Sequence, residues 1–314
     1  MIYNVEEILM YKTGFVGIVG KPNAGKSSLV NKMVGFKVAI TTPKPQTTRF
    51  NIKGIRTSEI SQIIFVDTPG VHNPKHKLGE YMMKGVSKAI LDTDLIIYLV
   101  DATKPVLDEA NKKIMSDIVN AKKKIILCIN KVDSIKKENI LRIIEEYNKH
   151  ISILGGSFID IIPISVYKND GLDILVNSIE KLLPEQEPIF TEDEVTDITE
   201  RDIAEEIIRE KALSYLDEEI PHGINVKIER MKLRTTENGN EVYDIDAEII
   251  CKKDSHKPII IGKNGDMLKK ITNNARREIA EMTDTRVNLK IWVKVRKDWE
   301  NVDNFLGNIK DKIR

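Results

Sequence analysis

At 314 residues the chain is longer than one ordinary domain, and its hydrophobic content of 41% is that of a protein with a full core, so we expect two domains. Lysine and arginine (49) nearly cancel aspartate and glutamate (48), so the net charge gives no sign of a polyanionic partner. The charge is nevertheless uneven, because Pro184–Glu210 holds eleven acidic and two basic residues, whereas Ser255–Lys297 holds eleven basic and four acidic. This distribution predicts one acidic stretch and one basic face.

The two cysteines, Cys128 and Cys251, stand in apolar runs without the paired spacing of a zinc site or a disulfide, so we expect two buried thiols. Glu6 and Glu7 stand where a secretory signal would be basic. The longest apolar run, Leu95–Val100, is too short to span a bilayer. These features predict a cytoplasmic protein.

From Thr13 to Leu183, short apolar runs alternate with amphipathic or loop segments. This alternation predicts an α/β fold, a mostly parallel sheet with helices on both faces. In such sheets ligands bind beyond the carboxyl ends of the strands, so the residues after each strand are the candidates for function. The predicted strands are Phe15–Val19, Ile63–Val66, Leu95–Val100, Ile125–Ile129 and Ile159–Ile164.

Gly20–Ser27 follows the first predicted strand and leads into an amphipathic helix, Ser28–Val34. Its pattern of glycine, four residues, glycine, lysine and serine matches a phosphate-binding loop, in which glycines let backbone amides surround a phosphate at a helix N-terminus. Lys26 would reach the β- and γ-phosphates, and Ser27 would bind Mg²⁺. The predicted phosphate-binding residues are Gly20, Lys21, Pro22, Asn23, Ala24, Gly25, Lys26, Ser27 and Ser28.

Asp67-Thr68-Pro69-Gly70 directly follows the second predicted strand. Asp67 suits an outer magnesium ligand, and the Gly70 amide suits the γ-phosphate. Alone, an aspartate three residues before a glycine is often only a turn. Its place after a strand favours the functional interpretation.

Asn130-Lys131-Val132-Asp133 follows the fourth predicted strand and indicates a guanine base. The Asp133 carboxylate can accept hydrogen bonds from the ring N–H and the exocyclic amine of guanine, whereas adenine would leave it unpaired. Asn130 can tie the base to the phosphate loop, and the Lys131 stem can lie over the ring. The alternative is an Asx turn after a strand. Ser165-Val166-Tyr167, after the last strand, stands where a backbone amide contacts the guanine oxygen, a weak motif by itself.

Thr47-Thr48-Arg49 is the best candidate for the loop that senses the γ-phosphate, with the Thr48 hydroxyl on Mg²⁺. Thr41 and Thr42 are the competing choices. The residues that we expect to take part in hydrolysis are Lys26, Thr48 and Gly70.

Val71 follows Gly70, where the best known small GTPases carry a glutamine that positions water. Valine can neither donate nor accept a hydrogen bond, so hydrolysis should rest on positioning, Mg²⁺ and a second cation, and should be slow unaided. His72 is a candidate substitute base, but we favour an exposed loop histidine. A metal site formed by His72 and His76 is a weaker alternative.

The sequence Pro184–Pro188 breaks the alternating pattern. We therefore predict a nucleotide-binding domain over residues 1–183, an acidic linker over 184–200 and a second, smaller α+β domain over 201–314. The elements predicted in the second domain are a helix, two strands around a turn, a helix and a strand: Glu200–Glu218, Asn225–Arg230, Glu241–Cys251, Gly265–Glu281 and Arg286–Val295.

Gly262-Lys263-Asn264-Gly265 lies between the apolar stretch Pro258–Ile261, interpreted as a strand, and a basic helix. This is the glycine-bounded loop of a KH domain, which brings backbone amides close to an RNA backbone; a plain helix entry turn is the alternative. We interpret Trp292, in the final strand, as a core residue rather than a platform on which a base stacks. The predicted RNA-binding residues are Ile261, Gly262, Lys263, Asn264, Gly265, Lys269, Lys270, Arg276 and Arg277.

Together these motifs resemble the Era family of bacterial GTPases over nearly the whole chain. The resemblance rests on Gly20–Ser27, Gln46–Arg49, Asp67–Gly70, Asn130–Asp133 and Gly262–Gly265, with Ile228–Arg230, Ile259–Gly262 and Trp292–Val295 in support. It implies a P-loop GTPase domain followed by a KH domain, with GTP or GDP and Mg²⁺ as ligands. It also implies a factor for 30S ribosomal subunit assembly that binds the 3′ end of 16S ribosomal RNA, with the nucleotide state governing access.

The same resemblance implies peripheral association with the inner membrane, and it makes Asn23 a candidate for holding K⁺ near the phosphates. Val71 agrees with a family that carries an apolar residue in place of the glutamine. Val166 departs from the more usual alanine, with little expected consequence because the base contact uses backbone. We expect a monomer. The rival interpretations are a GTP-binding RNA scaffold with negligible hydrolysis and an RNA-modifying enzyme regulated by GTP, for which the sequence shows no catalytic cysteine pair or cofactor loop.

Overall fold

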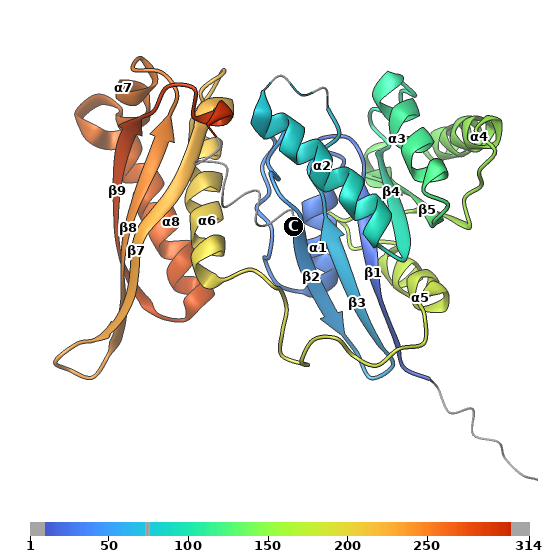
Figure 1. Cartoon of the computed structure of the whole chain (residues 1–314), viewed down its shortest axis with the longest axis horizontal. Helices are drawn as coiled ribbons and strands as arrows, with labels where there is room; N and C mark the ends of the chain where they lie inside the picture. Colours follow the sequence, from blue (N-terminus) through green and yellow to red (C-terminus); the bar gives the residue numbers. More distant parts are fainter. Residues whose placement is uncertain (1–9, 73, 75, 303–314) are drawn as a thin grey trace, which may run out of the picture. The chain divides into compact units, whose positions relative to one another are not determined.

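The computed structural model describes residues 10–72, 74 and 76–302, so Glu6 and Glu7 lie outside the described residues. The described chain forms two compact units (Figure 1). The first contains the chain up to Val38, Phe50–His72 and Met82–Asp197; the second contains Ala39–Arg49, residues 76–81 and the chain from Ile198. Both cysteines are buried, as predicted. None of the described helices is long and apolar enough to cross a membrane.

The first unit is built on a six-stranded sheet with the order β2-β3-β1-β4-β5-β6, in which only the β2–β3 pair is antiparallel. All five predicted strands are confirmed. The additional strand, β2, was not predicted because Lys53, Gly54 and Arg56 interrupt its apolar residues. The strands are β1 (Lys12–Val19), β2 (Ile52–Thr57), β3 (Ser61–Asp67), β4 (Leu95–Asp101), β5 (Lys124–Asn130) and β6 (Asp160–Pro163).

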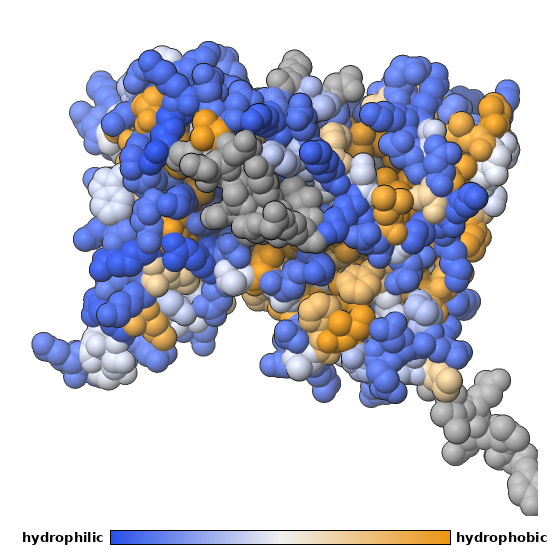
Figure 2. Space-filling model, in the orientation of Figure 1, coloured by the Kyte–Doolittle hydropathy of each residue, from blue (hydrophilic) through white to orange (hydrophobic). Residues whose placement is uncertain are grey.

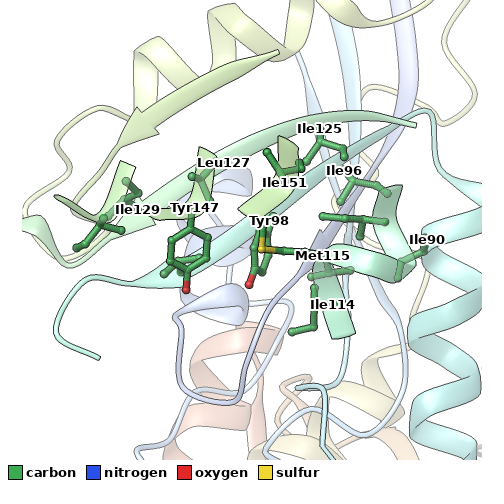
Figure 3. Close-up of a cluster of buried hydrophobic side chains, with 14 of the residues drawn as sticks. Ile90, Ile96, Tyr98, Ile114, Met115, Ile125, Leu127, Ile129, Tyr147 and Ile151 are labelled. Carbon is green, nitrogen blue, oxygen red and sulfur yellow. The ribbon is translucent and has the colours of Figure 1, made fainter. Parts of the chain in front are cut away.

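Five helices accompany this sheet in the described chain: α1 (Lys26–Val34), α2 (Lys77–Asp92), α3 (Glu109–Asn120), α4 (Lys137–Ile153) and α5 (Leu172–Leu182). A cluster of buried side chains fills the space between the central strands and α2, α3 and α4 (Figure 3). Within it, the Tyr98 and Tyr147 ring centroids are 5.9 Å apart, and the Tyr98 hydroxyl donates to Asn111 Oδ1 at 2.9 Å. Each fully buried aliphatic side chain there contributes about 1.5–3 kcal/mol, which holds the central strands and their carboxyl ends in place.

The segment after α5 stays with the first unit up to Asp197. The buried Gln62 side chain accepts hydrogen bonds from the Ile189 and Phe190 amides at 2.8 and 2.9 Å. Farther along, the Ile55 amide donates to the Val195 carbonyl at 2.9 Å, beside β2. The acidic segment therefore covers part of an edge strand, where backbone groups would otherwise lack partners.

The second unit has a three-stranded sheet with the order β7-β8-β9, antiparallel between β7 and β8 and parallel between β8 and β9. Helices α6 and α8 pack side by side along one face of this sheet (Figure 1). A capping box of Thr199 and Asp202 fixes the start of α6. The elements are α6 (Glu200–Tyr215), β7 (Ile224–Thr235), β8 (Glu241–Cys251), α7 (His256–Ile261), α8 (Asp266–Thr283) and β9 (Arg286–Val295).

Two predictions in the second unit were wrong. Pro258–Ile261 is part of the short helix α7 rather than a strand, because proline is tolerated in the first turn of a helix and a short apolar run does not distinguish the two structures. Trp292 is not a core residue, since 51% of its surface is exposed. Its strand alternates buried odd-numbered with exposed even-numbered residues, which places Trp292 on the face opposite α6 and α8.

Candidate functional site

The phosphate loop, Gly20–Ser27, turns between β1 and α1, and its shape requires glycine at two positions. A Cβ atom on Gly25, whose φ is 100°, would lie 2.4 Å from Asn130 Nδ2. A Cβ atom on Gly20 would lie 2.3 Å from the Leu99 carbonyl oxygen. The loop is thus held against the ends of β4 and β5, and the backbone amides at the N-terminus of α1 form an anion site.

Lys26 is buried, and its amine bridges the phosphate loop. Nζ donates to the carbonyl oxygens of Gly20 at 3.2 Å and Lys21 at 3.1 Å. Burial lowers the pKa of Lys26 to about 8, and the charge of Asp67 opposes that shift. The Lys26 amine therefore lies inside the phosphate loop, where the negative charge of a bound polyphosphate would raise the pKa of Lys26 again.

Ser27 and Asp67 meet at the start of α1 and the end of β3. The Ser27 hydroxyl donates to Asp67 Oδ2 at 2.6 Å, and Asp67 is fully buried. A hydroxyl and a carboxylate beside a phosphate loop are the hard oxygen donors that Mg²⁺ prefers. The residues present thus fit a magnesium ion.

Asn130 joins three loops at the carboxyl ends of the strands. Its Nδ2 donates to the Ala24 carbonyl oxygen at 2.8 Å, and its Oδ1 accepts from the Lys131 amide at 2.8 Å and from the Val166 amide at 3.2 Å. Asn130 is therefore hydrogen-bonded to the phosphate loop, whereas its contact with a base stays a prediction.

Asp133 is held as a carboxylate. Ser165 Oγ donates to its Oδ1 at 2.5 Å and Ser134 Oγ to its Oδ2 at 3.1 Å, and the Ser165 bond is the main cause of its lowered pKa. Tyr167, by contrast, is 85% exposed, and its role in nucleotide binding stays a prediction.

Three residues that the sequence reasoning missed support these loops. Asp101 Oδ2 accepts from Lys131 Nζ at 2.6 Å, which also donates to the Asn23 carbonyl at 2.9 Å. Asp108 pairs with Lys21 at 2.5 Å and also caps α3. The third residue, Ser134, donates its hydroxyl hydrogen to Asp133 Oδ2. Asp101 directly follows an apolar strand, the signal used for Asp67, and could have been found in the same way.

The segment after Asp67 lies against the phosphate loop. A Cβ atom on Gly70 would lie 2.7 Å from Pro22 Cγ, and the Val71 amide donates to the Gly20 carbonyl at 3.3 Å. The Val71 side chain packs against the apolar cluster of Figure 3. His72 is half-buried rather than exposed as predicted, because its Nδ1 lies 2.9 Å from the Gly70 carbonyl oxygen. Within the described ranges, no group of three or more potential metal-binding side chains is present.

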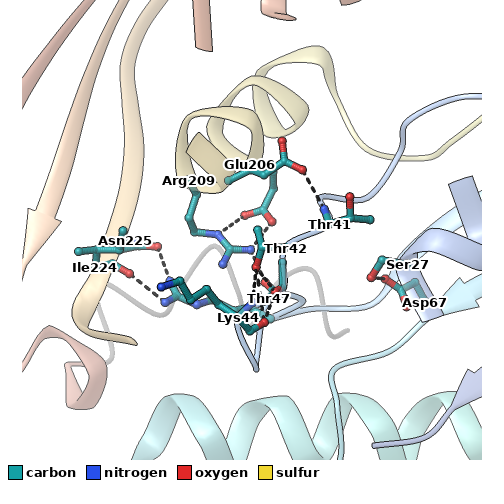
Figure 4. A network of polar contacts seen from close by, with 12 residues as sticks. Ser27, Thr41, Thr42, Lys44, Thr47, Asp67, Glu206, Arg209, Ile224 and Asn225 are labelled. Atoms are coloured by element: carbon teal, nitrogen blue, oxygen red, sulfur yellow. Dashed lines mark hydrogen bonds and ion pairs between the residues drawn. The ribbon is translucent and has the colours of Figure 1, made fainter. Parts of the chain in front are cut away.

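Thr48 lies in the Ala39–Arg49 segment, which packs with the second unit, whereas Ser27 and Asp67 belong to the first. Its role as a magnesium ligand therefore stays a prediction. The competing threonines have other contacts: the Thr41 amide donates to Glu210 Oε1 at 2.9 Å, and the Thr42 and Thr47 hydroxyls are 2.9 Å apart (Figure 4).

Two buried arginines fasten the Ala39–Arg49 segment within the second unit. Arg209 Nη2, from α6, donates to the Thr47 carbonyl at 2.5 Å and pairs with Glu206 (Figure 4). Arg49 donates to the Ile224 carbonyl at 2.8 Å. Burial lowers the pKa of Arg49 to about 9, and the Arg209 charge adds to this effect.

The glycine loop, Gly262–Gly265, joins α7 to α8. Gly262 has φ 77° and ψ 172°, and a Cβ there would lie 2.7 Å from the Cβ of Met267. Lys263 and Asn264 between the glycines are exposed. The loop therefore presents a cation, an amide side chain and backbone to solvent.

The basic helix predicted after this loop is α8, and Lys269, Arg276 and Arg277 are exposed on it. Lys270 differs, because its Nζ lies 4.2 Å from the centroid of the Tyr215 ring. Toward its C-terminal end, α8 and the start of β9 line an open hollow of about 850 Å³ that includes Arg276, Arg277 and Arg286. The predicted cations thus extend from the glycine loop along one helix.

Two family models match the chain. The model described as 50S ribosome-binding GTPase matches residues 15–131, from β1 to the residue after β5. The model described as KH domain matches residues 219–300, which include the glycine loop and α8.

Curated relatives named GTPase Era match along nearly the whole length. The relative from Clostridioides difficile (strain 630) is 45% identical over 300 residues, covering 95% of this chain and 98% of the relative. The relative from Ruminiclostridium cellulolyticum is 47% identical over 302 residues, covering 96% of this chain and 98% of the relative.

Solved structures give the same result. The crystal structure of Era in complex with MgGDPNP and nucleotides 1506–1542 of 16S ribosomal RNA has a TM-score of 0.89 and 39% identity, covering 95% of this chain and 98% of that chain. A variant of Aquifex aeolicus Era bound to GDP·AlF4− has a TM-score of 0.88 and 40% identity, covering 94% and 98%. The first unit therefore has the fold of a P-loop GTPase, and the second that of a KH domain.

Proposed function

Because the chain belongs to the Era family of GTPases, we propose that it is a GTP-hydrolysing switch that binds the 3′ end of 16S ribosomal RNA and acts in 30S subunit assembly. The observation that carries this proposal is the position of Asn130, which ties the phosphate loop at Ala24 to the amide of Val166. One side chain thereby links the place for phosphates to the place for a guanine base.

Substrate binding rests on the phosphate loop. The amides at the start of α1 receive the β-phosphate, and the Lys26 amine lies across the loop where it meets the β- and γ-phosphates. Ser27 and Asp67 would hold Mg²⁺, which when bound neutralises charge on those phosphates. The affinity for polyphosphate therefore comes mainly from backbone and one lysine.

Selection of guanine rests on Asp133. Its two oxygens are kept ionised by Ser165 and Ser134, so they accept hydrogen bonds from the ring N–H and the amine of guanine. Adenine has no matching pair of donors on that edge, so a carboxylate that gave up water to contact it would be left without a hydrogen-bond donor, which is costly.

Hydrolysis in this proposal proceeds without a side chain that orients the attacking water at position 71. Val71 packs against the apolar cluster, so the Gly70 amide and Lys26 are the groups left to hold the γ-phosphate in line. We propose that Thr48 completes the site and that the Asn23 side chain helps to hold K⁺. Slow turnover in the absence of RNA is the consequence.

RNA binding is proposed for the glycine loop and α8. In the solved relative, Era is in complex with nucleotides 1506–1542 of 16S ribosomal RNA. Lys263 and Asn264 at the tip of the loop, followed by the cations of α8, suit a single-stranded RNA backbone. Ile261, which we also propose as an RNA contact, precedes the loop at the end of α7.

Coupling between nucleotide and RNA is proposed to run through α6. The Ala39–Arg49 segment, which we expect to sense the γ-phosphate, is fastened by Arg209 and Glu210. The next residue on α6, Lys211, pairs with Glu278 of α8, the helix that begins at the glycine loop. A change in the segment thus has a short, packed route to the RNA-binding elements.

The proposal includes the division into a GTPase domain (1–183), a linker (184–200) and a KH domain (201–314), a cytoplasmic location with peripheral membrane association, and a monomer. Phosphate release under multiple turnover, measured with and without 16S RNA fragments, tests the enzymatic part. Turnover that exceeds the buffer rate and responds to RNA is expected. GTP binding without measurable turnover under either condition would instead favour the scaffold alternative.

A further inference from the structure

Trp292 lies on the outer face of the KH sheet, the face away from α6 and α8. Its strand, β9, buries Val287, Leu289, Ile291 and Val293 against the helices and exposes the residues between them. At 51% exposure, the indole leaves much of a large apolar ring in water. The position is not required by the core.

The surroundings of Trp292 are charged. Lys290 and Lys294 flank it on the same face of β9. Across the sheet, Trp292 aligns with Glu248 of β8, which in turn aligns with Lys227 of β7. Hydrophilic residues predominate over the second unit on the side seen in Figure 2. The ring is therefore surrounded by cations and anions rather than by an apolar patch.

The anions of this face already have partners. Glu248 pairs with Lys294 at 2.8 Å, Asp246 with Arg230 at 2.7 Å, and Asp244 with Arg234 at 2.6 Å. Glu229, at the bulge of β7, pairs with Lys227 at 2.9 Å. Lys232 and Lys290 form no ion pair with any described residue. The face thus presents neutralised carboxylates, two uncompensated ammonium groups and one aromatic ring.

We propose that the outer face of the KH sheet is a second RNA-binding surface, on which an unpaired base stacks on Trp292 while the flanking phosphates lie against Lys290 and Lys232. This inference rests on the proposed RNA-binding function and extends it beyond the glycine loop. A flat ring beside cations matches a nucleobase and its phosphates, which every single-stranded segment offers. A protein partner would need a broader apolar centre than one ring among ion pairs.

This surface is separate from the glycine loop. The loop and α8 belong to the helical layer of the unit, whereas Trp292 lies on the opposite side of the sheet. A KH domain holds about four nucleotides at its glycine loop, so a longer RNA is needed to reach both places. The length of the RNA therefore separates the two contributions.

The test compares two RNAs and three variants. A single strand of about five nucleotides occupies the glycine loop alone, and a strand of about twenty reaches both surfaces. Trp292→Ala is expected to weaken binding of the long RNA about tenfold and to leave the short RNA unchanged, whereas Trp292→Phe should retain most of the affinity. Leu233→Ala removes another exposed apolar side chain of the same sheet and should change neither.

Fluorescence gives a second readout. The chain has two tryptophans, and Trp299 is 0% exposed, so quenching by acrylamide reports on Trp292. The long RNA should protect the indole from the quencher, and the short RNA should not. Unchanged affinity of Trp292→Ala for the long RNA, or quenching that the long RNA leaves unaltered, would overturn this inference. Absence of binding of either RNA to the unmodified protein would overturn the proposed RNA function itself.

Discussion

The guanidinium of Arg49 lies 5.3 Å from the ring centre of the buried Trp299, and the same arginine donates to the Ile224 carbonyl and to Asn225 Oδ1. Arg49 ends the segment in which Thr48 is the predicted γ-phosphate sensor. Arg49 therefore fixes the Ala39–Arg49 segment to the Trp299 ring and to β7 of the second unit.

Replacing Arg49 should loosen that segment. Arg49→Ala removes the donors of the Ile224 carbonyl and the cation over Trp299, with an expected loss of about 2–4 kcal/mol in the stability of the second unit. Urea unfolding followed by Trp299 fluorescence in a Trp292→Phe background measures it. Arg276→Ala, on the exposed face of α8, is the matched control and should stay within about 0.5 kcal/mol. Equal stabilities of the two variants would contradict the role of Arg49.

Gly25 and Gly35 form a matched pair at the two ends of α1, since both have positive φ. A Cβ on Gly25 would lie 2.4 Å from Asn130 Nδ2, whereas a Cβ on Gly35 would meet no atom within 4 Å. Gly25→Ala should weaken GTP binding by about 100-fold, because it displaces the Asn130 amide. Gly35→Ala should cost about 1 kcal/mol in stability and leave GTP affinity unchanged. Calorimetric titration with GTP measures the affinity of each variant. Similar GTP affinities of Gly25→Ala and Gly35→Ala would contradict the inference that a Cβ at position 25 displaces Asn130.

GTP affinity should fall as the pH rises above about 8. In the protein without nucleotide the pKa of Lys26 is about 8, so the amine becomes neutral above that pH. Phosphate favours the charged form and raises this pKa, so binding above pH 8 must take up a proton, and the affinity should fall by up to about tenfold per pH unit. Titrations between about pH 7 and 9.5 measure this, with Lys26→Met as a weaker-binding variant that lacks the dependence. A flat profile for the unmodified protein would refute it.

Asp133→Asn should shift the base preference from guanine toward xanthine. The amide reverses one donor–acceptor relation on the edge that the carboxylate reads, and a lost charged hydrogen bond weakens GTP binding by about 10- to 100-fold. Competition between GTP and XTP measures the shift. Unchanged GTP affinity would mean that Asp133 does not read the base.

Potassium should accelerate GTP hydrolysis relative to sodium if Asn23 helps to hold it. Asn23 has a φ of 64°, which glycine adopts readily. Asn23→Gly therefore removes the side chain and leaves the backbone conformation of the phosphate loop unchanged. The variant should bind GTP and lose the difference between the two salts. Equal turnover of the unmodified protein in both salts would remove potassium from the mechanism.

Local pattern was sufficient for much of the first unit. Apolar runs such as Ile125–Ile129 are long enough to mark buried strands, and the rule that function follows the strand ends led to Asp67 and Asn130. The same rule applied to Asp101 would have found the partner of Lys131. Ser134 was missed because a serine beside Asp133 carries no signal of its own.

The remaining features depend on contacts distant in sequence. Nothing local shows that Ala39–Arg49 packs with residues beyond Ile198, since Arg49 and Ile224 are far apart along the chain. The exposure of Trp292 depends on which face of the sheet the helices cover. The alternation along a strand sorts its residues into two faces, but it does not show which of the two faces is buried. Pro258–Ile261 was too short for periodicity to separate helix from strand.

Each unit contains segments from separate parts of the sequence, so the chain cannot be cut at one position into two self-contained units. Ala39–Arg49 and residues 76–81 interrupt the first unit in sequence and fold with the second. A truncated protein that ends at residue 183 would still carry Ile40 and Leu78, both buried in the full chain, without the residues beyond Ile198 that share their unit. Expression of the nucleotide-binding part alone should therefore yield an aggregation-prone fragment, and its enzymology would not represent that of the whole protein.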